Sequence, residues 1–331
     1  MRKLSGNTRR PSLCGKSNTG TIAMNLTPYT NRTVEAIYRH YEANRKNPHR
    51  PHLGGSQIGL SCSRALWYQF RWAASGNLHG RVLRLFETGD REEERIVRNL
   101  RDIGVEVWQY DEEGNQFRAT AHGGHFALSV DGVGLGFIES SKPHVLEFKT
   151  ANEKSFNKMR NHGLEKAHPQ YWAQVHVAML LMDLDRAYFI MVNKNTDDIY
   201  VERVTLDKAF AESLIEKAGD IIFAETPPPK IAETDDWYEC KFCRYRAVCQ
   251  RGHIPEVNCR TCAHSTPEPD GSWSCAIGGD MKTCDKHVFR PDMMPWEVHD
   301  AGQGWVEYVT TDGEIIRNEG NSYKLWEERE G

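Results

Sequence analysis

Two acidic residues and a lysine stand close together in a stretch that we expect to form β-strands. Asp131 lies in the first of two predicted strands, 126–133, and Glu147 and Lys149 lie in the second, 144–150. Successive side chains of a strand point to opposite faces, so Glu147 and Lys149 share one face. Carboxylate oxygens are ligands that Mg²⁺ or Mn²⁺ prefers, and an ammonium group beside them would attract a phosphate. The pattern indicates a metal-dependent phosphodiesterase centre; an exposed ion pair on an ordinary strand is the alternative.

Polar residues on two predicted helices would add to this centre. Glu93 falls on the apolar stripe of a helix over residues 85–103. A carboxylate directed at a core is costly without a cation or donors, so Glu93 is either a third acid of the site or a paired glutamate at the core edge. A helix opened by Pro169 places Gln174 on an inward stripe, where its amide could orient a water or a phosphate oxygen. A core glutamine satisfied by water is the alternative.

A further phosphate contact is expected near the start of a helix within residues 56–70. Ser56 and Arg64 flank the predicted start, where free backbone N–H groups would favour an anion. An ordinary capped helix explains the same residues. The remaining expected elements alternate between helix and strand and predict a mixed α/β core: helices at 31–43, 169–182 and 206–224, a hairpin of strands 186–193 and 199–204, and a polar, exposed stretch at 154–163.

Nine cysteines form the second chemical signal, and seven of them fall between residues 240 and 284. No apolar signal segment is present, so disulfides explain them poorly and metal ligation explains them better. We therefore expect the cysteine-rich stretch 240–284 to bind metal.

A second set of four cysteines follows in a loop-rich stretch of about 30 residues. Cys259, Cys262, Cys275 and Cys284 have a two-plus-two arrangement in sequence that is rich in Gly, Pro and Asp. So few apolar residues cannot fold alone, which predicts a small structural Zn²⁺ site. His264 and His287 are alternative ligands; free thiols, or ligands shared with the first set, are the other interpretations. Such a module could contact DNA or a protein partner.

Charge and hydropathy set the limits on location. The chain has 331 residues and a net charge of −4, but residues 1–50 hold ten Lys or Arg against two Glu. We expect residues 1–30 to be a disordered basic tail that could attract a phosphate backbone. The residues before Met24 could also be a transit peptide, or upstream sequence if the true start is Met24. No apolar run is long enough to span a membrane. We expect a cytoplasmic protein of a bacterial cell or a phage-infected host.

The chemical residues, taken in order, resemble the motifs of the PD-(D/E)xK nuclease superfamily. They read Gly89-x3-Glu93, then Asp131, then Glu147-Phe-Lys149, then Tyr171-x2-Gln174. The cysteine pattern, one early residue in Cys-Ser-Arg-Ala-Leu-Trp-Tyr and a late trio, is similar to that of the RecB, Cas4 and lambda-exonuclease-like branch. The resemblance covers roughly residues 50–250. Val130 replaces the proline of the motif, and Glu93 favours the lambda-type members while the cysteines favour the others.

The resemblance implies a role for each matched residue. Asp131 and Glu147 would bind Mg²⁺ or Mn²⁺, Lys149 would be the catalytic lysine, Glu93 an auxiliary acid, and Tyr171 and Gln174 helpers. It also implies that Cys62, Cys240, Cys243 and Cys249 hold a [4Fe–4S] cluster that joins distant segments, although four thiolates suit Zn²⁺ as well.

The fold implied by the resemblance is a restriction-endonuclease-like mixed β-sheet flanked by helices. We expect a nuclease domain over residues 31–252, a four-cysteine zinc module over 253–295 and a β-hairpin tail over 296–331. The implied activity is DNA hydrolysis in phage or bacterial recombination or repair, by an exonuclease that could work with a single-strand-annealing protein and as an oligomer. A non-catalytic, metal-stapled DNA- or protein-binding module is the alternative.

Overall fold

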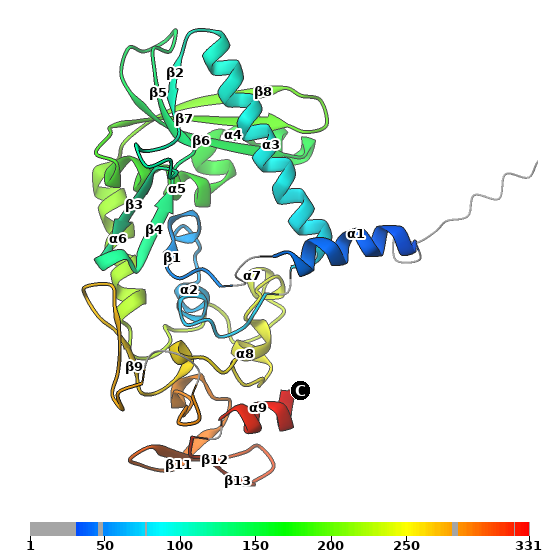
Figure 1. Cartoon of the computed structure of the whole chain (residues 1–331), viewed down its shortest axis with the longest axis vertical. Coiled ribbons are helices and arrows are strands. Elements are labelled where there is room, and N and C mark those ends of the chain that lie inside the picture. The colour runs from blue at the N-terminus through cyan, green and yellow to red at the C-terminus, as the bar shows by residue number, and fades with distance from the viewer. Residues whose placement is uncertain (1–30, 46–48, 77, 280–283, 321, 331) are drawn as a thin grey trace, which may run out of the picture.

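A five-stranded mixed sheet forms one end of an elongated molecule (Figure 1). The computed structural model describes residues 31–45, 49–76, 78–279, 284–320 and 322–330, so the predicted tail and Met24 lie outside the described residues. The strand order is β2 (Glu106–Trp108), β5 (Gly132–Leu135), β6 (His144–Ala151), β7 (Arg186–Asn193) and β8 (Ile199–Thr205). β6 and β7 are parallel, and all other neighbours are antiparallel. The protein is therefore of the mixed α/β class, as predicted.

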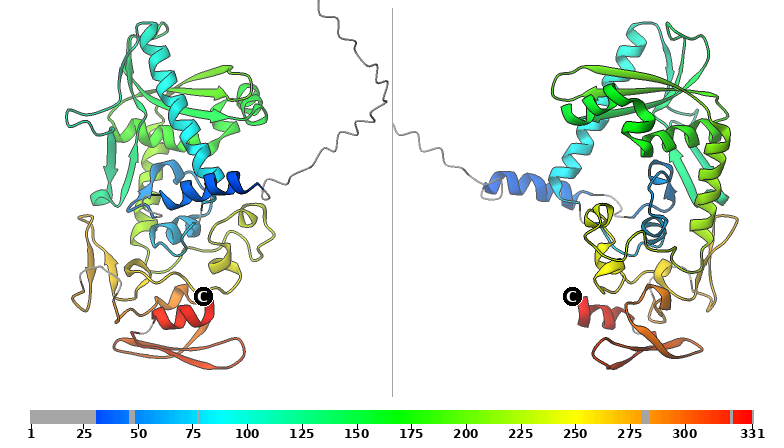
Figure 2. Two further views of the ribbon diagram at one scale, coloured as in Figure 1. Left: turned by 45° about the vertical axis from the view of Figure 1, so that its right-hand side comes forward. Right: turned by 180° about the vertical axis from the view of Figure 1, so that it is seen from behind.

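The two faces of this sheet pack in different hydrophobic cores. Successive side chains of β6 point alternately into one core and the other. Leu146 and Phe148 pack with Ile96 and Val97 of helix α3 (Gly80–Asp102) on one face. Val145 packs in the larger core on the other face, which contains helix α5 (Pro169–Leu181). Figure 2 shows α3 and α5 on opposite sides of the sheet. Glu147 and Lys149 share the parity of Val145, so they face α5 as the period of a strand requires.

Helix α5 is buried on nearly every side, which makes it a central element instead of a surface helix. Pro169 stands at its first turn, where the missing N–H costs no helical hydrogen bond.

Helix α3 begins five residues before the predicted start and is capped by the His79 side chain. Two apolar residues of the predicted helix, Phe86 and Ile103, are exposed, and the buried residues Ile96, Val97 and Leu100 pack on the sheet.

The predicted strand 126–133 is wrong in one respect, because it is divided between two sheets. β4 (Phe126–Ser129) pairs with β1 (Leu53–Gly54) and β3 (Arg118–Ala121), whereas β5 joins the main sheet. Asp131 lies in the short connection between them. A Cβ on Gly132 would lie 2.7 Å from the Trp108 carbonyl oxygen, so glycine permits the chain to pass close to β2 at this point.

The stretch 154–163, which we expected to be polar and exposed, lies in a helix, α4 (Glu153–Ala167), and its polar residues are exposed or partly exposed as predicted. The Asn152 side chain caps it by accepting a hydrogen bond from Ser155 N. Phe156 and Met159 are buried against the main core while the polar residues between them face solvent. Two apolar positions among mostly polar residues are too few to predict a helix from the sequence alone.

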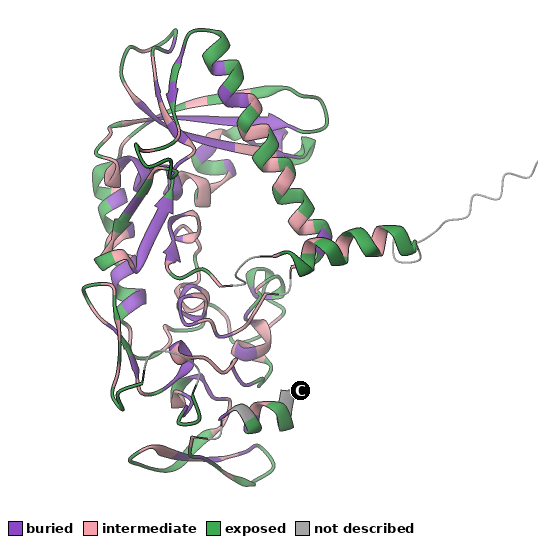
Figure 3. Ribbon diagram, in the orientation of Figure 1, coloured by how far each residue is buried: buried purple, intermediate pink, exposed green. Residues whose placement is uncertain are grey.

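The other described elements complete the body and the opposite end of the molecule. Figure 3 shows burial concentrated in the main sheet and α5, with α1 largely exposed. No helix in the described ranges combines the length and apolar character needed to cross a bilayer. The remaining helices are α1 (Arg32–Ala43), α2 (Ser63–Phe70), α6 (Lys208–Phe223), α7 (Tyr238–Lys241), α8 (Arg246–Gln250) and α9 (Ser322–Glu330), with 3₁₀ turns at Gly55–Gln57, His122–Gly124, Cys259–Thr261 and Pro291–Met293, and the remaining strands are β9 (Ser265–Pro267), β10 (Trp273–Cys275), β11 (Glu297–Gly302), β12 (Trp305–Val309) and β13 (Ile315–Asn318).

The C-terminal part packs against the body through buried side chains. The predicted hairpin is present as β12 and β13, and it gains a third strand, β11, and helix α9, which we did not predict. Arg260 donates hydrogen bonds to the carbonyls of Phe70 (2.9 Å) and Pro51 (2.6 Å). Its guanidinium lies 4.0 Å from the ring centroid of Trp72 and 4.6 Å from that of Trp273. The segment carrying the second cysteine set is thus anchored to the N-terminal part of the body.

We expect Arg260→Ala to lower the free energy of unfolding by about 2–4 kcal/mol, because it removes cation–π contacts and leaves two carbonyls without donors. Thermal unfolding would show a midpoint several degrees lower. Arg251→Ala is the matched control: Arg251 is half exposed and pairs with Asp235, so its removal should change little. Equal midpoints for the two variants would contradict the anchoring role.

Candidate active site

Asp131 is held against β6 by a backbone hydrogen bond. Its Oδ2 accepts from Phe148 N at 2.6 Å, which fixes the carboxylate beside the strand that carries Glu147 and Lys149. Burial raises the pKa of Asp131, although the Lys149 charge and the Phe148 N–H both act to lower it. The position between two sheets thus directs this carboxylate to the same place as the β6 residues.

Glu147 is only 1% exposed and lies at the centre of the group. Its Oε1 accepts hydrogen bonds from Gln174 Nε2 (2.7 Å) and from Lys149 Nζ. Its Oε2 has no partner among the described residues. Burial raises the pKa of Glu147 to about 7 against the effect of Lys149, and the charge of Asp131 adds to the rise. A buried oxygen without a donor is costly unless something else binds it.

Lys149 remains a cation in this setting. Burial acts to lower its pKa, but the charges of Glu147 and Asp131 outweigh burial and raise it. The side chain is 24% exposed, so part of it lies at the border between the buried carboxylates and solvent. Nζ lies 5.3 Å from the ring centroid of Tyr171, which stacks in turn on His168. Tyr171 and Gln174 therefore support the ammonium and the glutamate from α5.

Glu93 joins the group from α3. Its carboxylate accepts a hydrogen bond from Gln109 Nε2 at 3.3 Å. Burial and the charges of Asp131 and Asp90 raise the pKa of Glu93 to about 7. The charge of Asp131 thus affects the pKa of Glu93, as expected if both acids belong to one site. Gln109 was not predicted as a site residue, because nothing in its sequence context distinguishes it from a surface glutamine beside β2.

The donor set fits a hard divalent cation. Asp131, Glu147 and Glu93 offer carboxylate oxygens, the kind of ligand that Mg²⁺ and Mn²⁺ prefer, and the unpartnered Oε2 of Glu147 is available to a cation. Within the described ranges no three His, Cys, Asp or Glu side chains stand ready as a preformed metal site. Lys149 and Gln174 contact the other oxygen of Glu147, and Phe148 N holds Asp131, so an ion would have to displace or share these contacts.

These raised carboxyl pKa values predict how cation binding depends on pH. A carboxyl whose folded pKa exceeds its unfolded value stabilises the cation-free protein at low pH, and this contribution is lost as pH rises toward 7. A cation binds the ionised form and displaces protons, so we expect Mn²⁺ to raise the unfolding temperature more at about pH 8 than at about pH 6. Thermal unfolding with and without Mn²⁺ measures this difference. The Asp131→Asn control should lose the shift at both pH values, and an equal wild-type shift at both would contradict the assignment.

Ser56 and Arg64, the predicted phosphate contacts, have different partners in the structure. The Ser56 carbonyl accepts a hydrogen bond from Gln170 Nε2 (2.8 Å) at the start of α5, near the carboxylates. Arg64 instead donates to the Pro228 carbonyl (2.9 Å) and lines a cavity with the first cysteine set. The role of both residues as phosphate contacts stays a prediction.

The four cysteines of the first set converge although Cys62 lies far from the other three in the sequence. Cys62, Cys240, Cys243 and Cys249 all line one cavity of about 960 Å³. The Cys62 Sγ also caps α2 by accepting from Ala65 N at 3.4 Å. Burial raises the thiol pKa of Cys243, and the charges of Cys62, Cys249 and Cys240 add to the rise. The four thiols thus line one space, although the described cysteines do not stand as a preformed metal-binding group.

In the second set, Cys262 is buried and Cys275 and Cys284 lie near it. Burial raises the pKa of Cys262, and the charges of Cys284 and Cys275 raise it further. His287 stays an alternative ligand, because its Nε2 contacts the Asn258 carbonyl at 3.0 Å while its buried Nδ1 has no partner among the described residues. Burial lowers the pKa of His287 to about 4, so the ring is neutral.

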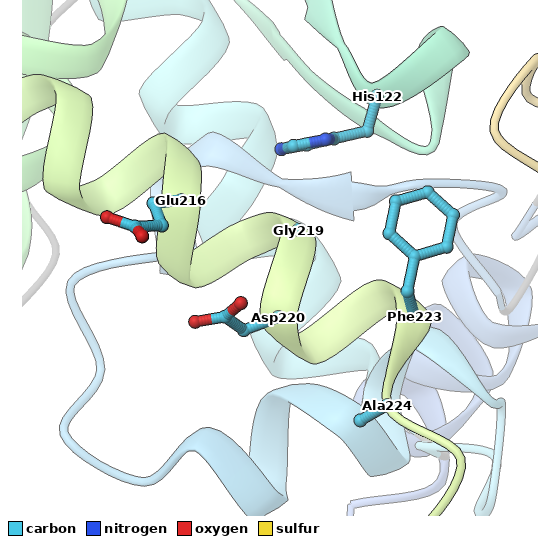
Figure 4. Close-up of a pocket in the computed structure, with 6 residues that line it drawn as sticks. All are labelled: His122, Glu216, Gly219, Asp220, Phe223 and Ala224. Atoms are coloured by element: carbon cyan, nitrogen blue, oxygen red, sulfur yellow. The ribbon is translucent and has the colours of Figure 1, made fainter.

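A smaller cavity of about 490 Å³ lies on α6, away from these groups (Figure 4). His122 covers Gly219, where a Cβ would lie 2.7 Å from the imidazole, and Phe223 lies beside it. None of Asp131, Glu147 or Lys149 lines this cavity. It therefore has no part in the candidate site.

Comparison with known proteins yields distant structural likenesses. No protein-family model and no curated protein matches the chain. The crystal structure of SSO0001 aligns with a TM-score of 0.39 at 13% identity, covering 67% of this chain and 97% of that one. An alkaline exonuclease, LHK-Exo from Laribacter hongkongensis, aligns at 0.36 and 14% identity over 55% of this chain and 90% of its own. Its complex with dAMP aligns at 0.37 and 12% identity, over 56% and 90%. Scores this low carry no conclusion about activity.

Proposed function

We propose that the protein is a Mg²⁺- or Mn²⁺-dependent deoxyribonuclease that hydrolyses phosphodiester bonds, most simply as an exonuclease. The observation that carries this proposal is the meeting of Asp131, Glu147 and Lys149. One hydrogen bond from Phe148 N fixes Asp131 beside β6, and Lys149 contacts Glu147 directly. A structural ion pair would not need a buried second carboxylate and an unpartnered Glu147 oxygen beside it.

Each residue of the site would have its own role in the reaction. Asp131 and Glu147 would hold the divalent cation, with Glu93 as an auxiliary acid. When bound, such a cation acidifies a water molecule and stabilises negative charge on the phosphate. Lys149 would place its ammonium against a phosphate oxygen and the attacking water. Gln174 and Tyr171 would keep Glu147 and Lys149 in place from α5, which is rigid because it is buried.

The first cysteine set would hold a [4Fe–4S] cluster that ties α2 to α7 and α8, and the second would hold Zn²⁺. The thiols that gather in each region support these assignments. DNA is the proposed substrate, and a role in recombination or repair with a protein partner fits the same chemistry.

Cleavage of end-labelled DNA tests the proposal. Single- and double-stranded substrates labelled at the 5′ or 3′ end are incubated with and without Mg²⁺, and the products also report polarity. We expect cleavage that requires the cation and is abolished by Glu147→Gln. DNA binding without cleavage under all conditions would favour the alternative, a non-catalytic binding module.

A further inference from the structure

The cavity of the first cysteine set carries more positive charge than its thiols can neutralise. Seven cationic or titratable basic side chains line it, against one carboxylate: Arg45, His49, Arg50, Arg64, Lys230, Arg244 and Arg246, against Glu239. His49 and Arg246 pair with acids elsewhere. The charge balance of the others decides whether the cavity needs a further anion.

Four of these cations have no acidic partner in the described part of the chain. Arg50 and Lys230 contact the neutral side chains of Ser56 and Gln250, each at 3.4 Å. Arg64 donates to the Pro228 carbonyl and the Tyr68 hydroxyl, and Arg244 lies over the Tyr245 ring at 6.0 Å. A doubly charged metal core held by four thiolates would carry about two negative charges, whether iron–sulfur or zinc. Positive charge therefore remains after the thiolate centre is counted.

Exposed aromatic rings stand at the same cavity. Phe242 is 81% exposed and Tyr238 is 73% exposed, and both line it. Their ring centroids are 5.8 Å apart, in an edge-to-face arrangement. Two large rings this exposed and in contact with each other form an apolar surface patch in α7 and just after it, the kind of feature that marks a binding surface. Cations that follow a backbone, combined with rings on which bases stack, are the features of a single-strand site.

The cavity is also connected to the catalytic group. The segment that contributes Gln57 and Leu60 to its wall is fixed by α5, because Gln170 donates to the Ser56 carbonyl. Lys217 of α6 donates to the carbonyls of Ile58 (2.9 Å) and Leu60 (2.6 Å). The same short segment thus lies between the helix that carries Gln174 and the cysteine cavity.

We propose that this cavity binds a segment of single-stranded DNA outside the catalytic centre, with phosphates on Arg50, Lys230 and Arg244 and bases stacked on Phe242 and Tyr238. The proposal rests on the proposed function, because it takes DNA as the substrate. Cys240 and Cys243 lie between and beside the two rings in the sequence, so the metal centre would hold the stacking platform in place.

Fluorescence anisotropy tests the proposal with the full-length holoprotein and a labelled thymidine oligonucleotide of about 20 bases. Divalent cations are omitted, so that binding is measured without cleavage. We expect the double variant Tyr238→Ala and Phe242→Ala to bind about tenfold more weakly or worse, because each ring supports one base. Arg244→Gln should reduce the salt dependence of binding by about one ion. Both variants should keep the metal content and unfolding temperature of the wild type.

Tyr110→Ala is the matched control, since Tyr110 is also an exposed ring but does not line the cavity. Unchanged single-strand affinity in the double variant, or an equal loss in Tyr110→Ala, would overturn the proposal. A loss confined to duplex DNA would overturn it as well. If the double variant binds normally while the wild type still cleaves DNA with Mg²⁺, only this inference fails. If the wild type neither binds nor cleaves DNA, the proposed function fails with it.

Discussion

Lys149→Ala is expected to lower Mg²⁺-dependent DNA cleavage by about a thousandfold while leaving the fold intact. The ammonium is the cation nearest to Glu147, and no other described lysine or arginine contacts that carboxylate. Without it, a phosphate oxygen in the site would face two or three carboxylates with less positive charge to offset them. Initial rates on end-labelled DNA, at saturating Mg²⁺, measure the loss.

The control for this variant is Lys154→Ala, which removes an exposed lysine of α4 outside the site. Its rate should equal that of the wild type. Circular dichroism and thermal unfolding of Lys149→Ala should show a folded protein. A folded Lys149→Ala variant that keeps a tenth or more of the wild-type rate would remove Lys149 from the reaction.

Cys243→Ser is expected to have the largest effect on stability. Cys243 lies in the cavity wall with residues of α2, α7 and α8, and a metal centre there would add a strong link to the packing that already joins these segments. We expect the loss of the iron content and brown colour of protein purified without oxygen, and a fall in unfolding temperature on the order of 10 °C. Metal analysis and thermal unfolding of the two proteins measure these effects.

Cys14→Ser is the matched control for the cysteine experiment, because Cys14 belongs to neither set of four. It should match the wild type in colour, metal content and unfolding temperature. Stable, colourless wild-type protein prepared without oxygen would refute the iron–sulfur assignment, and stoichiometric zinc in its place would assign the first set to Zn²⁺.

Features of the site that depend on local sequence spacing could be predicted from the sequence alone. The period of a strand placed Glu147 and Lys149 on one face, and β6 has that arrangement. Pro169 marked the start of α5, and the stripe through Tyr171 and Gln174 brought both side chains to the β6 residues. These features depend on short sequence spacings, so they can be read without knowing the fold.

Features that depend on contacts between distant segments could not be predicted from the sequence in this way. Residues 126–133 are apolar enough for one strand, and only the pairing of β4 and β5 with different neighbours places Asp131 between two sheets. The contact of Gln109 with Glu93 and the cations around the cysteine cavity arise from segments far apart in the chain. The union of Cys62 with the later trio was anticipated only through family resemblance, because spacing does not pair distant thiols.

The central claim is that Asp131 and Glu147 share one divalent ion beside the Lys149 ammonium. Crystals grown with Mn²⁺, measured at a wavelength where manganese scatters anomalously, test it most directly. We predict one strong anomalous peak in contact with oxygens of both carboxylates, at about 2.2 Å, with Lys149 Nζ facing the same space. A peak that touches only one of the two carboxylates, or no peak there in protein that cleaves DNA with Mn²⁺, would contradict the claim.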